Sequence, residues 1–188
     1  MKQQTFIALG IAMAALVRVD AIIVTPMTFE QLVDEAVAAV YGRVAEVRGQ
    51  WTSDRQSIDS LVTVDALRYL KGDLGDAVTL RLPGGEVGSV VNVLPGAPVL
   101  RPGDLVVLFL KARGPAIPTT LGLGQGIFRV ARDPKSGAML VTPPPLKESA
   151  SGRIVRGAAE RRALTLDIFA ETVRARTVVG GASNGAAR

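Results

Sequence analysis

The chain has 188 residues, of which 48% are hydrophobic and only 4% aromatic, and its formal net charge is +5. These values predict one modest domain with an aliphatic core, flanked by extensions. Because the sequence contains no Cys and no His, it excludes thiol nucleophiles, disulfides, imidazole bases and the usual zinc and copper ligands.

Residues 1–21 have the organisation of a signal peptide. A short start carrying Lys2 precedes the twelve residues "FIALGIAMAALV", whereas a helix that spans a bilayer needs about 20 apolar residues. Val19 and Ala21 provide the small residues of a cleavage site, so we expect cleavage before Ile22 and a secreted or periplasmic protein with no stable membrane span. The alternative is an uncleaved interfacial anchor. No Cys follows the apolar run, which excludes a lipoprotein.

The positive charge is concentrated near the C-terminus. Residues 22–146 contain twelve Lys or Arg and twelve Asp or Glu, whereas residues 147–188 contain eight basic and four acidic residues. A barrel that binds nucleic acid carries its basic surface on the domain, together with aromatic side chains that stack on bases. The sequence therefore predicts no nucleic-acid partner.

A short helix is predicted at the start of the mature chain. Thr28 followed by Gln31 fits a capping box, and Met27 and Leu32 lie where a hydrophobic staple packs. We expect the helix over residues 29–36.

Three strands are predicted after this helix. The stretch "AVAAVYGRVAEVRGQ" is rich in β-branched residues, and Gly42 within it indicates a bend or bulge. The polar loop "WTSDRQSID" separates it from "SLVTVDALRYLKGD", and "AVTLRLPGG" follows after a turn. The residues predicted to face the core on the second and third strands are Val62, Val64, Ala66, Val78, Leu80 and Leu82.

Because residues 84–104 are rich in Gly and Pro, we expect them to form a long irregular connection, with a short strand over residues 90–94. The run "LVVLFL", residues 105–110, predicts a strand that is apolar on both faces, as happens when a terminal helix covers the outer side of a sheet. The stretches "GIFRVARD" and "AMLVTP" flank "PKSG" as a hairpin. About six short strands between turn clusters predict a mainly β protein, specifically a small OB-like β-barrel.

The composition changes after residue 146. We expect a β-barrel domain with its N-terminal helix over residues 22–146, then a basic linker and an amphipathic C-terminal helix over residues 147–179. Within that helix Leu166, Phe169 and Val173 have helical spacing, with Thr165 as the N-cap. Residues 180–188 are predicted to be a disordered tail.

Five stretches of the sequence together resemble a family of uncharacterised exported bacterial proteins. They are "VYGRVAEVRGQW", "TVDALRYLKGD", "RLPGGEVGS", "PGAPVLRPGDLVVLFL" and "GLGQGIFRV". More distantly, residues 28–141 resemble the netrin-like domains of tissue metalloproteinase inhibitors, which implies an OB-type barrel. Those inhibitors engage the protease metal through an N-terminal Cys held by disulfides. The predicted mature end here is Ile22 and the chain has no Cys, so the resemblance implies the fold and not protease inhibition.

Three residues are candidates for interaction with a partner. Trp51 is the only Trp and lies in a polar loop, where it either anchors recognition or covers the end of the barrel. Glu86 lies in the Gly-rich connection, and Ile22 is the predicted mature N-terminus.

Catalytic and metal sites have weaker support. Glu86 and Asp104 would be the carboxylates of a hydrolase, although Asp in a turn usually bonds local backbone. Ser89 has no motif that places it beside Lys71 or Lys111. The acidic residues Asp54, Asp59, Asp73 and Asp76 lack the spacing of a calcium loop. Gly84, Gly85 and Gly88 lack the Lys and Ser/Thr of a phosphate loop. The cluster Arg153, Arg156, Arg161 and Arg162 fits a solvated linker, with adhesion to an anionic surface as the alternative. No cofactor is expected.

The sequence therefore predicts an exported, non-enzymatic β-barrel that acts through contacts of its surface loops with another protein, with an exported protease as the candidate partner. The alternative is an exported hydrolase that works with carboxylates alone. A deep pocket with two close carboxylates would favour the hydrolase, and a shallow barrel end with Trp51 exposed would favour binding.

Overall fold

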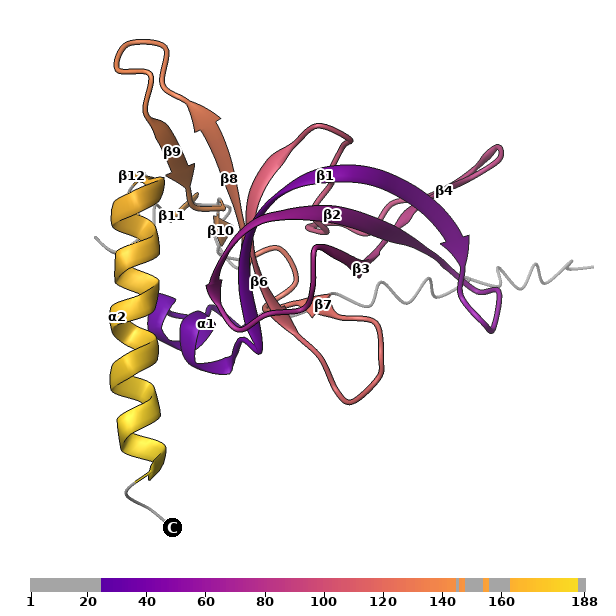
Figure 1. The fold of residues 1–188 in the computed structure, drawn as a ribbon. Helices are drawn as coiled ribbons and strands as arrows, with labels where there is room; N and C mark the ends of the chain where they lie inside the picture. The colour runs from indigo at the N-terminus through magenta and orange to yellow at the C-terminus, as the bar shows by residue number, and fades with distance from the viewer. Residues whose placement is uncertain (1–24, 145, 148–153, 156–162, 186–188) are drawn as a thin grey trace, which may run out of the picture.

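The structure is a computed structural model that describes residues 25–144, 146–147, 154–155 and 163–185. Within these residues the chain forms two helices and twelve strands (Figure 1). The helices are α1 (Phe29–Glu35) and α2 (Leu166–Gly185). The strands are β1 (Ala38–Trp51), β2 (Ile58–Lys71), β3 (Ala77–Pro83), β4 (Gly85–Val87), β5 (Val90–Asn92), β6 (Leu105–Lys111), β7 (Thr119–Thr120), β8 (Ile127–Arg132), β9 (Met139–Thr142), β10 (Leu146–Lys147), β11 (Ile154–Val155) and β12 (Leu164–Thr165).

Eight of the strands form one sheet in the order β1-β2-β3-β7-β6-β8-β9-β12, and β1 also pairs with β6. Hydrogen bonding thus leads from β1 through β2, β3, β7 and β6 back to β1. These ladders are antiparallel except for β3 and β7, which pair in parallel through Arg81 and Thr119. The protein is mainly β with two helices, as predicted. The expected number of about six strands is too low, because two-residue strands such as β7 exist only through pairing with their neighbours.

Long, curved strands make up the first hairpin. Strands β1 and β2 have 14 residues each and arch over one end of the molecule (Figure 1). Their register shifts between Tyr41 and Gly42, and again between Val44 and Glu46. A Cβ at Gly42 would lie 2.5 Å from the Asp65 carbonyl oxygen. Gly42 therefore permits the irregularity that the sequence predicted there, and irregularities of this kind bend a strand.

Strand β6 is buried on both faces. Val107 and Phe109 belong to a cluster that α1 and α2 cover, whereas Val106, Leu108 and Leu110 belong to a second cluster lined by β1, β2 and β3. All five side chains are completely buried. The prediction that this apolar run is a strand with a helix covering its outer face is confirmed.

Four phenylalanines join the helices to the sheet. Phe29 of α1, Phe169 of α2, Phe109 of β6 and Phe128 of β8 form five ring contacts, with centroid separations from 5.1 Å to 6.2 Å. Most of these pairs are edge-to-face, and such pairs add about 0.5–1.5 kcal/mol beyond the area that they bury. Four of the five phenylalanines of the chain are therefore gathered in the part of the core that the helices cover, where their ring contacts determine how the helices pack on the sheet.

Helix α1 is fixed at both ends. The Thr28 hydroxyl accepts from the Gln31 backbone N–H at 3.2 Å, while the Gln31 side chain accepts from the Thr28 backbone N–H at 2.8 Å, so the predicted capping box is present. At the other end the Lys71 ammonium donates to the carbonyl of Val33 at 2.6 Å and to that of Asp34 at 3.2 Å. Burial lowers the pKa of Lys71, and the nearby Asp34 carboxylate opposes this shift.

A buried glutamine holds the segment that precedes α1. The Gln125 side-chain oxygen accepts from the Met27 backbone N–H at 2.8 Å, and its nitrogen donates to the Thr25 carbonyl at 2.9 Å. Gln125 is 4% exposed, so these bonds replace bonds to water. The chain therefore enters the fold at a fixed point beside the loop that follows β7.

Replacing this glutamine should loosen the N-terminal segment. We expect Gln125→Ala to lower the free energy of unfolding by about 1–3 kcal/mol, because it leaves partly buried backbone groups without their partner. Urea unfolding measures the loss, and Gln56→Ala in the exposed β1–β2 loop is the control. Equal stability of the two variants would show that Gln125 does not hold the segment.

Helix α2 packs along α1 and the edge of the sheet (Figure 1). It begins where the Thr165 hydroxyl accepts from the Ile168 N–H at 3.5 Å, and it buries Leu166, Phe169 and Val173, all as predicted. The helix continues to Gly185, so the prediction of a disordered tail from residue 180 is wrong over residues 180–185. This stretch contains no proline but three glycines, so its helical form depends on propagation from the packed turns before it and not on helix propensity. Residues 186–188 lie outside the described residues.

Among the residues that the structure describes, two ion pairs join α2 to its neighbours. The Arg176 guanidinium donates twice to the Asp34 carboxylate of α1, and Arg68 of β2 lies 3.1 Å from Asp167. The hydrogen bonds from Arg176 lower the pKa of Asp34 below its ordinary value.

The Asp34–Arg176 pair predicts a small dependence of stability on pH. Because the folded-state pKa of Asp34 is depressed, the contribution of this pair is present above the unfolded-state pKa of about 4 and is lost as the pH falls through the folded value. We expect Asp34→Asn to be less stable than the wild type at neutral pH, and the difference to shrink as the pH falls below about 4. Urea unfolding at several pH values measures it, with Asp65→Asn at an exposed position of β2 as the control. The effect is smaller than that of any core truncation, because exposed pairs are screened by solvent. A difference that stays constant as the pH is lowered through this range would contradict this role of the carboxylate.

The remaining elements complete the C-terminal part. Strands β8 and β9 form the hairpin predicted around "PKSG", and the Asp133 carboxylate accepts from the backbone N–H groups of Lys135 and Ser136 in its turn. Strands β10 and β11 pair within the region expected to be a basic linker, whose four clustered arginines lie outside the described residues. Among the described residues, neither helix has the length and apolar character needed to cross a bilayer.

Candidate interaction surface

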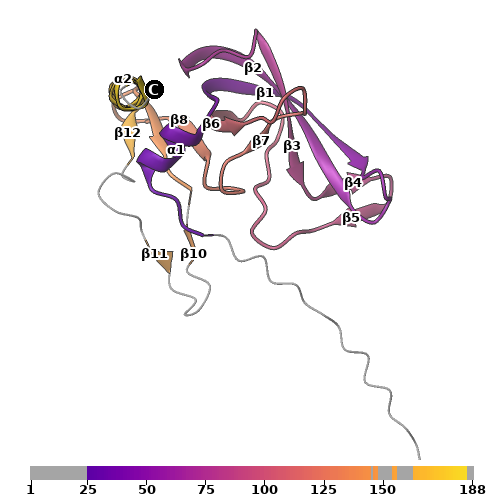
Figure 2. The ribbon, with the colours of Figure 1, turned by 90° about the horizontal axis from the view of Figure 1, so that it is seen from below.

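A small hairpin lies at the end of the molecule opposite α2. It consists of β4 and β5 and protrudes beyond the β1–β2 arch (Figures 1 and 2). Gly88 and Ser89 form its two-residue turn, and Gly88 has a φ of 61°, which glycine adopts without strain. The irregular connection predicted for residues 84–104 thus begins as an ordered hairpin.

The hairpin is anchored at its base to β2. The Gly84 N–H donates to the Ile58 carbonyl at 2.9 Å, and the Ser60 hydroxyl donates to the Gly84 carbonyl at 2.7 Å. Strand β4 also lies directly on β1, because any Cβ at Gly49 would collide with the Glu86 carbonyl oxygen. Backbone therefore packs on backbone here, and the hairpin has a defined position on the body.

Trp51 lies on the same face of β1 as Gly49, since residues two apart in a strand share a face. The structure thus brings Trp51 and Glu86, two of the three predicted interaction residues, to one end of the protein. The Trp51 side chain is 38% exposed, and it lines an open hollow together with Arg55. Ile22, the third predicted residue, lies outside the described residues.

Three exposed valines extend this end of the protein. Val90 is 45% exposed, Val91 is 61% exposed and Val93 is 78% exposed. We call these valines, together with Trp51 and Glu86, the hairpin surface; as neighbours in β5, Val90 and Val91 point to its two opposite faces. The sequence prediction missed the valines, although a signal was present: residues 83–100 carry one charged side chain, Glu86, in a stretch otherwise expected to face solvent.

The structure does not bring the two candidate carboxylates together. Asp104 accepts from the Arg101 N–H at 3.0 Å and pairs with Arg129 at 2.8 Å, which is the local role expected of an Asp in a turn. The Asp104 carbonyl bonds to Val44, whereas Glu86 lies on Gly49, five residues further along β1. Five residues of strand correspond to roughly 15 Å, whereas glycosidase carboxyl groups lie about 5 to 9.5 Å apart.

The other candidate catalytic and metal groups are also dispersed. Ser89 is in the hairpin turn, whereas Lys71 is the last residue of β2 and its ammonium bonds the C-terminal end of α1, at the other end of the molecule. Three of the four Asp residues considered for calcium have separate local roles: Asp54 and Asp73 bond their own turns, and Asp59 pairs with Arg81 at 3.7 Å. Bonds from Thr52 and the Gln56 backbone lower the pKa of Asp54. The part of the chain that the structure describes contains no group of three acidic residues placed to hold a metal ion.

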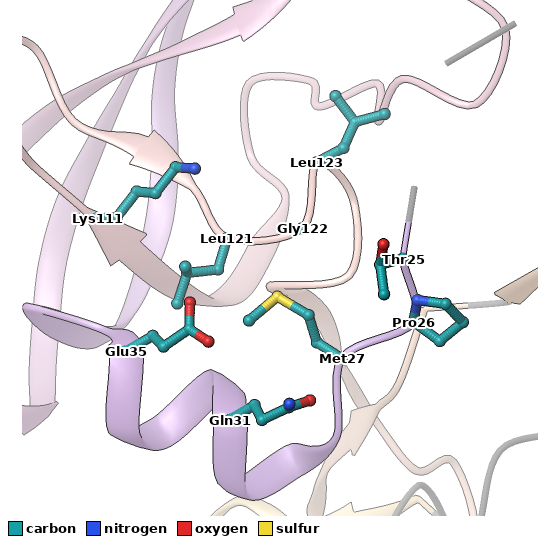
Figure 3. A pocket seen from close by; sticks show the side chains of 9 residues that line it. All are labelled: Thr25, Pro26, Met27, Gln31, Glu35, Lys111, Leu121, Gly122 and Leu123. Carbon is teal, nitrogen blue, oxygen red and sulfur yellow. The ribbon is translucent and has the colours of Figure 1, made fainter. Parts of the chain in front are cut away.

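A second open hollow lies beside the segment that Gln125 holds (Figure 3). Met27 and Leu121 form its floor, and Glu35 and Lys111 lie at its rim. Glu35 is the only carboxylate among the residues that line it, so this hollow does not have the pair of close carboxylates expected of a hydrolase. The full lining is Thr25, Pro26, Met27, Gln31, Glu35, Lys111, Leu121, Gly122 and Leu123.

Comparisons of the chain with protein-family models, with curated proteins and with solved structures give no match. The resemblance to netrin-like domains and to exported bacterial proteins therefore stays an expectation from the sequence. What the structure establishes is a mainly β protein whose exposed Trp51 lies beside an anchored hairpin with exposed valines.

Proposed function

We propose that this protein is an exported, non-enzymatic binding protein that contacts another protein through the hairpin surface. The observation that carries this proposal is a hairpin that is fixed to the body of the protein and yet exposes apolar side chains. The hairpin is anchored by Gly84, Ser60 and Gly49, yet it presents Val90, Val91, Val93 and Trp51 to solvent. An anchored surface loses little conformational entropy on binding, and exposed aromatic and aliphatic groups provide the contact area.

We also propose that the five strands β1, β2, β3, β7 and β6 are a small barrel of the OB class. The circuit of strand pairing that returns to β1 and the completely apolar cluster enclosed by β1, β2, β3 and β6 support this. The OB class is a five-stranded Greek-key barrel. In this arrangement the hairpin surface occupies one end of the barrel, and α1 and α2 cover the outer side of β6.

Site-specific photocrosslinking in the producing cell tests the binding function. A benzophenone amino acid placed at Val93 should give discrete covalent adducts with a second protein in the exported fraction. The same group at Lys135, in the exposed turn between β8 and β9, is the matched control and should give none. Equal labelling at the two positions, or no adduct at Val93, would refute the proposal.

The same preparation tests export. N-terminal sequencing of the exported protein should begin at Ile22. A chain that retains Met1 in the membrane fraction would contradict cleavage and favour the interfacial anchor.

The alternative function, a hydrolase that uses carboxylates alone, predicts a different result. Hydrolysis of chromogenic glycoside or ester substrates would have to disappear in both Glu86→Gln and Asp104→Asn. The separation of these two residues along β1 favours the binding function instead.

A further inference from the structure

Resting on the proposed function, we infer that the partner binds as an extended strand that adds to the free edge of β5 and carries Lys or Arg opposite Val91. The inference names the form and charge of the partner segment. It depends on the register of the β4–β5 hairpin, the exposure of β5, and the position of Glu86.

The register determines which backbone groups of β5 face outward. Val87 pairs with Val90 across the two-residue turn, Glu86 pairs with Val91, and Gly85 pairs with Asn92. Residues that flank a two-residue turn exchange both hydrogen bonds, and the next pair along the ladder exchanges none. The N–H and C=O of Val91 therefore point away from β4, toward the outer edge of β5.

This edge lacks most of the features that protect sheet edges. Natural edge strands are commonly blocked by Lys, by proline, by bulges or by a covering element. Strand β5 is Val-Val-Asn, and its only protection is that it is short. The high exposure of Val91 is consistent with an edge that no described element covers.

The neighbouring charge defines the chemistry of the partner. Glu86 is directly opposite Val91 in the antiparallel pair, so both side chains lie on the same face of the hairpin. A residue of an added strand opposite Val91 shares that face, about 10 Å from Glu86, or two strand spacings. A Lys or Arg there reaches across Val91 to the carboxylate, whereas Asp or Glu is repelled.

Other occupants fit less well. A second copy of β5 would place a Val or Asn opposite Val91, and so would not bring the Lys or Arg that the Glu86 carboxylate attracts. A bilayer rich in anionic lipid attracts Lys and Arg, but residues 83–100 contain neither and carry the negative charge of Glu86. An extended peptide with a central Lys or Arg gains main-chain hydrogen bonds to the N–H and C=O of Val91, an apolar contact with its side chain, and attraction to Glu86.

Two synthetic peptides and two variants of one residue test the inference. The probes are nine-residue peptides of alternating threonine and valine, one with lysine and one with glutamate at the central position. The protein is the exported form, and binding is followed by titration of its backbone amide NMR signals. We expect the lysine peptide to shift the signals of β5 and to bind at least threefold more tightly than the glutamate peptide. Glu86→Gln should remove this preference.

The backbone variant separates strand addition from side-chain packing. Val91→Pro removes the one outward N–H but keeps an apolar side chain, and proline is tolerated at an edge where no ladder bond is lost. Val91→Thr keeps the N–H and the shape. We expect the proline variant to weaken binding of the lysine peptide at least tenfold and the threonine variant to change it less than threefold. Unchanged urea unfolding of both variants confirms that the fold is intact; if the proline variant unfolds early, N-methylation of the peptide at alternate residues replaces it as the probe of the same hydrogen bonds.

Each contrary result overturns a defined part of the inference. Equal binding by Val91→Pro would show that side chains alone make the contact. A preference for the glutamate peptide would refute the charge assignment, and absence of binding by either peptide would refute strand addition. Co-sedimentation with phosphatidylglycerol vesicles that Val91→Asp abolishes would replace the peptide with a membrane. The crosslinking test at Val93 does not depend on the peptide results. Strand addition can therefore be refuted while the proposed binding function stands, and the binding function can be refuted although a peptide binds.

Discussion

Truncation of either Leu108 or Phe109 should visibly destabilise the protein, although these neighbours point to opposite faces of β6. Leu108 is in the cluster lined by β1, β2 and β3, and Phe109 is in the cluster under the helices. Both have zero exposure. Replacing a buried Leu or Phe by Ala costs about 2–5 kcal/mol, through lost transfer free energy and the cavity left behind.

Urea unfolding of the two variants tests whether both faces of β6 are buried. Total stabilities of single domains are about 5–15 kcal/mol, so urea unfolding detects each loss clearly. Phe109→Ala should be at the upper end of the range, because Phe109 contacts the rings of Phe29, Phe128 and Phe169. Val91→Ala on the exposed hairpin is the matched control and should change stability by less than about 0.5 kcal/mol. If Leu108→Ala or Phe109→Ala were equally silent, β6 would have one face in water and the two-sided core would be wrong.

Removal of α2 should have a still larger effect. A chain that ends after Ala163 loses Leu166, Phe169 and Val173, each completely or almost completely buried. At about 1.5–3 kcal/mol for each large apolar side chain, the loss is about 5 kcal/mol or more, which approaches the stability of a whole domain. It also exposes Phe109 and Phe128, whose rings α2 covers. We expect this shortened chain to unfold at ordinary temperature or to aggregate.

A chain that ends after Val179 is the control for α2. Val178 and Val179 are exposed at 74% and 61%, so the helix no longer packs on the body at this point. We expect the melting temperature of this chain to equal that of the full-length protein. If the chain that ends after Ala163 were as stable as the full-length protein, α2 would not pack on the sheet. If the chain that ends after Val179 were much less stable than the full-length protein, residues 180–188 would stabilise the fold.

The faces of the strands and the start of each helix follow from the sequence alone. Alternation over residues 78–82 identified the inward positions of β3, and the pair Thr28 and Gln31 identified the capping box of α1. The unbroken apolar run at residues 105–110 predicted burial on both faces, and the spacing of Leu166, Phe169 and Val173 predicted the covered face of α2. These features depend on residues close together in the chain, where periodicity and capping chemistry act directly.

Only the tertiary structure decided how these elements come together. The pairing of β1 with β6, the single parallel contact between β3 and β7, and the position of β4 on Gly49 each join residues far apart in the chain. No local pattern encodes such contacts, because they depend on the curvature of β1 and β2 and on which backbone can approach a glycine. For the same reason the sequence identified Trp51 and Glu86 separately, and only the fold placed them with Val91 on one anchored surface.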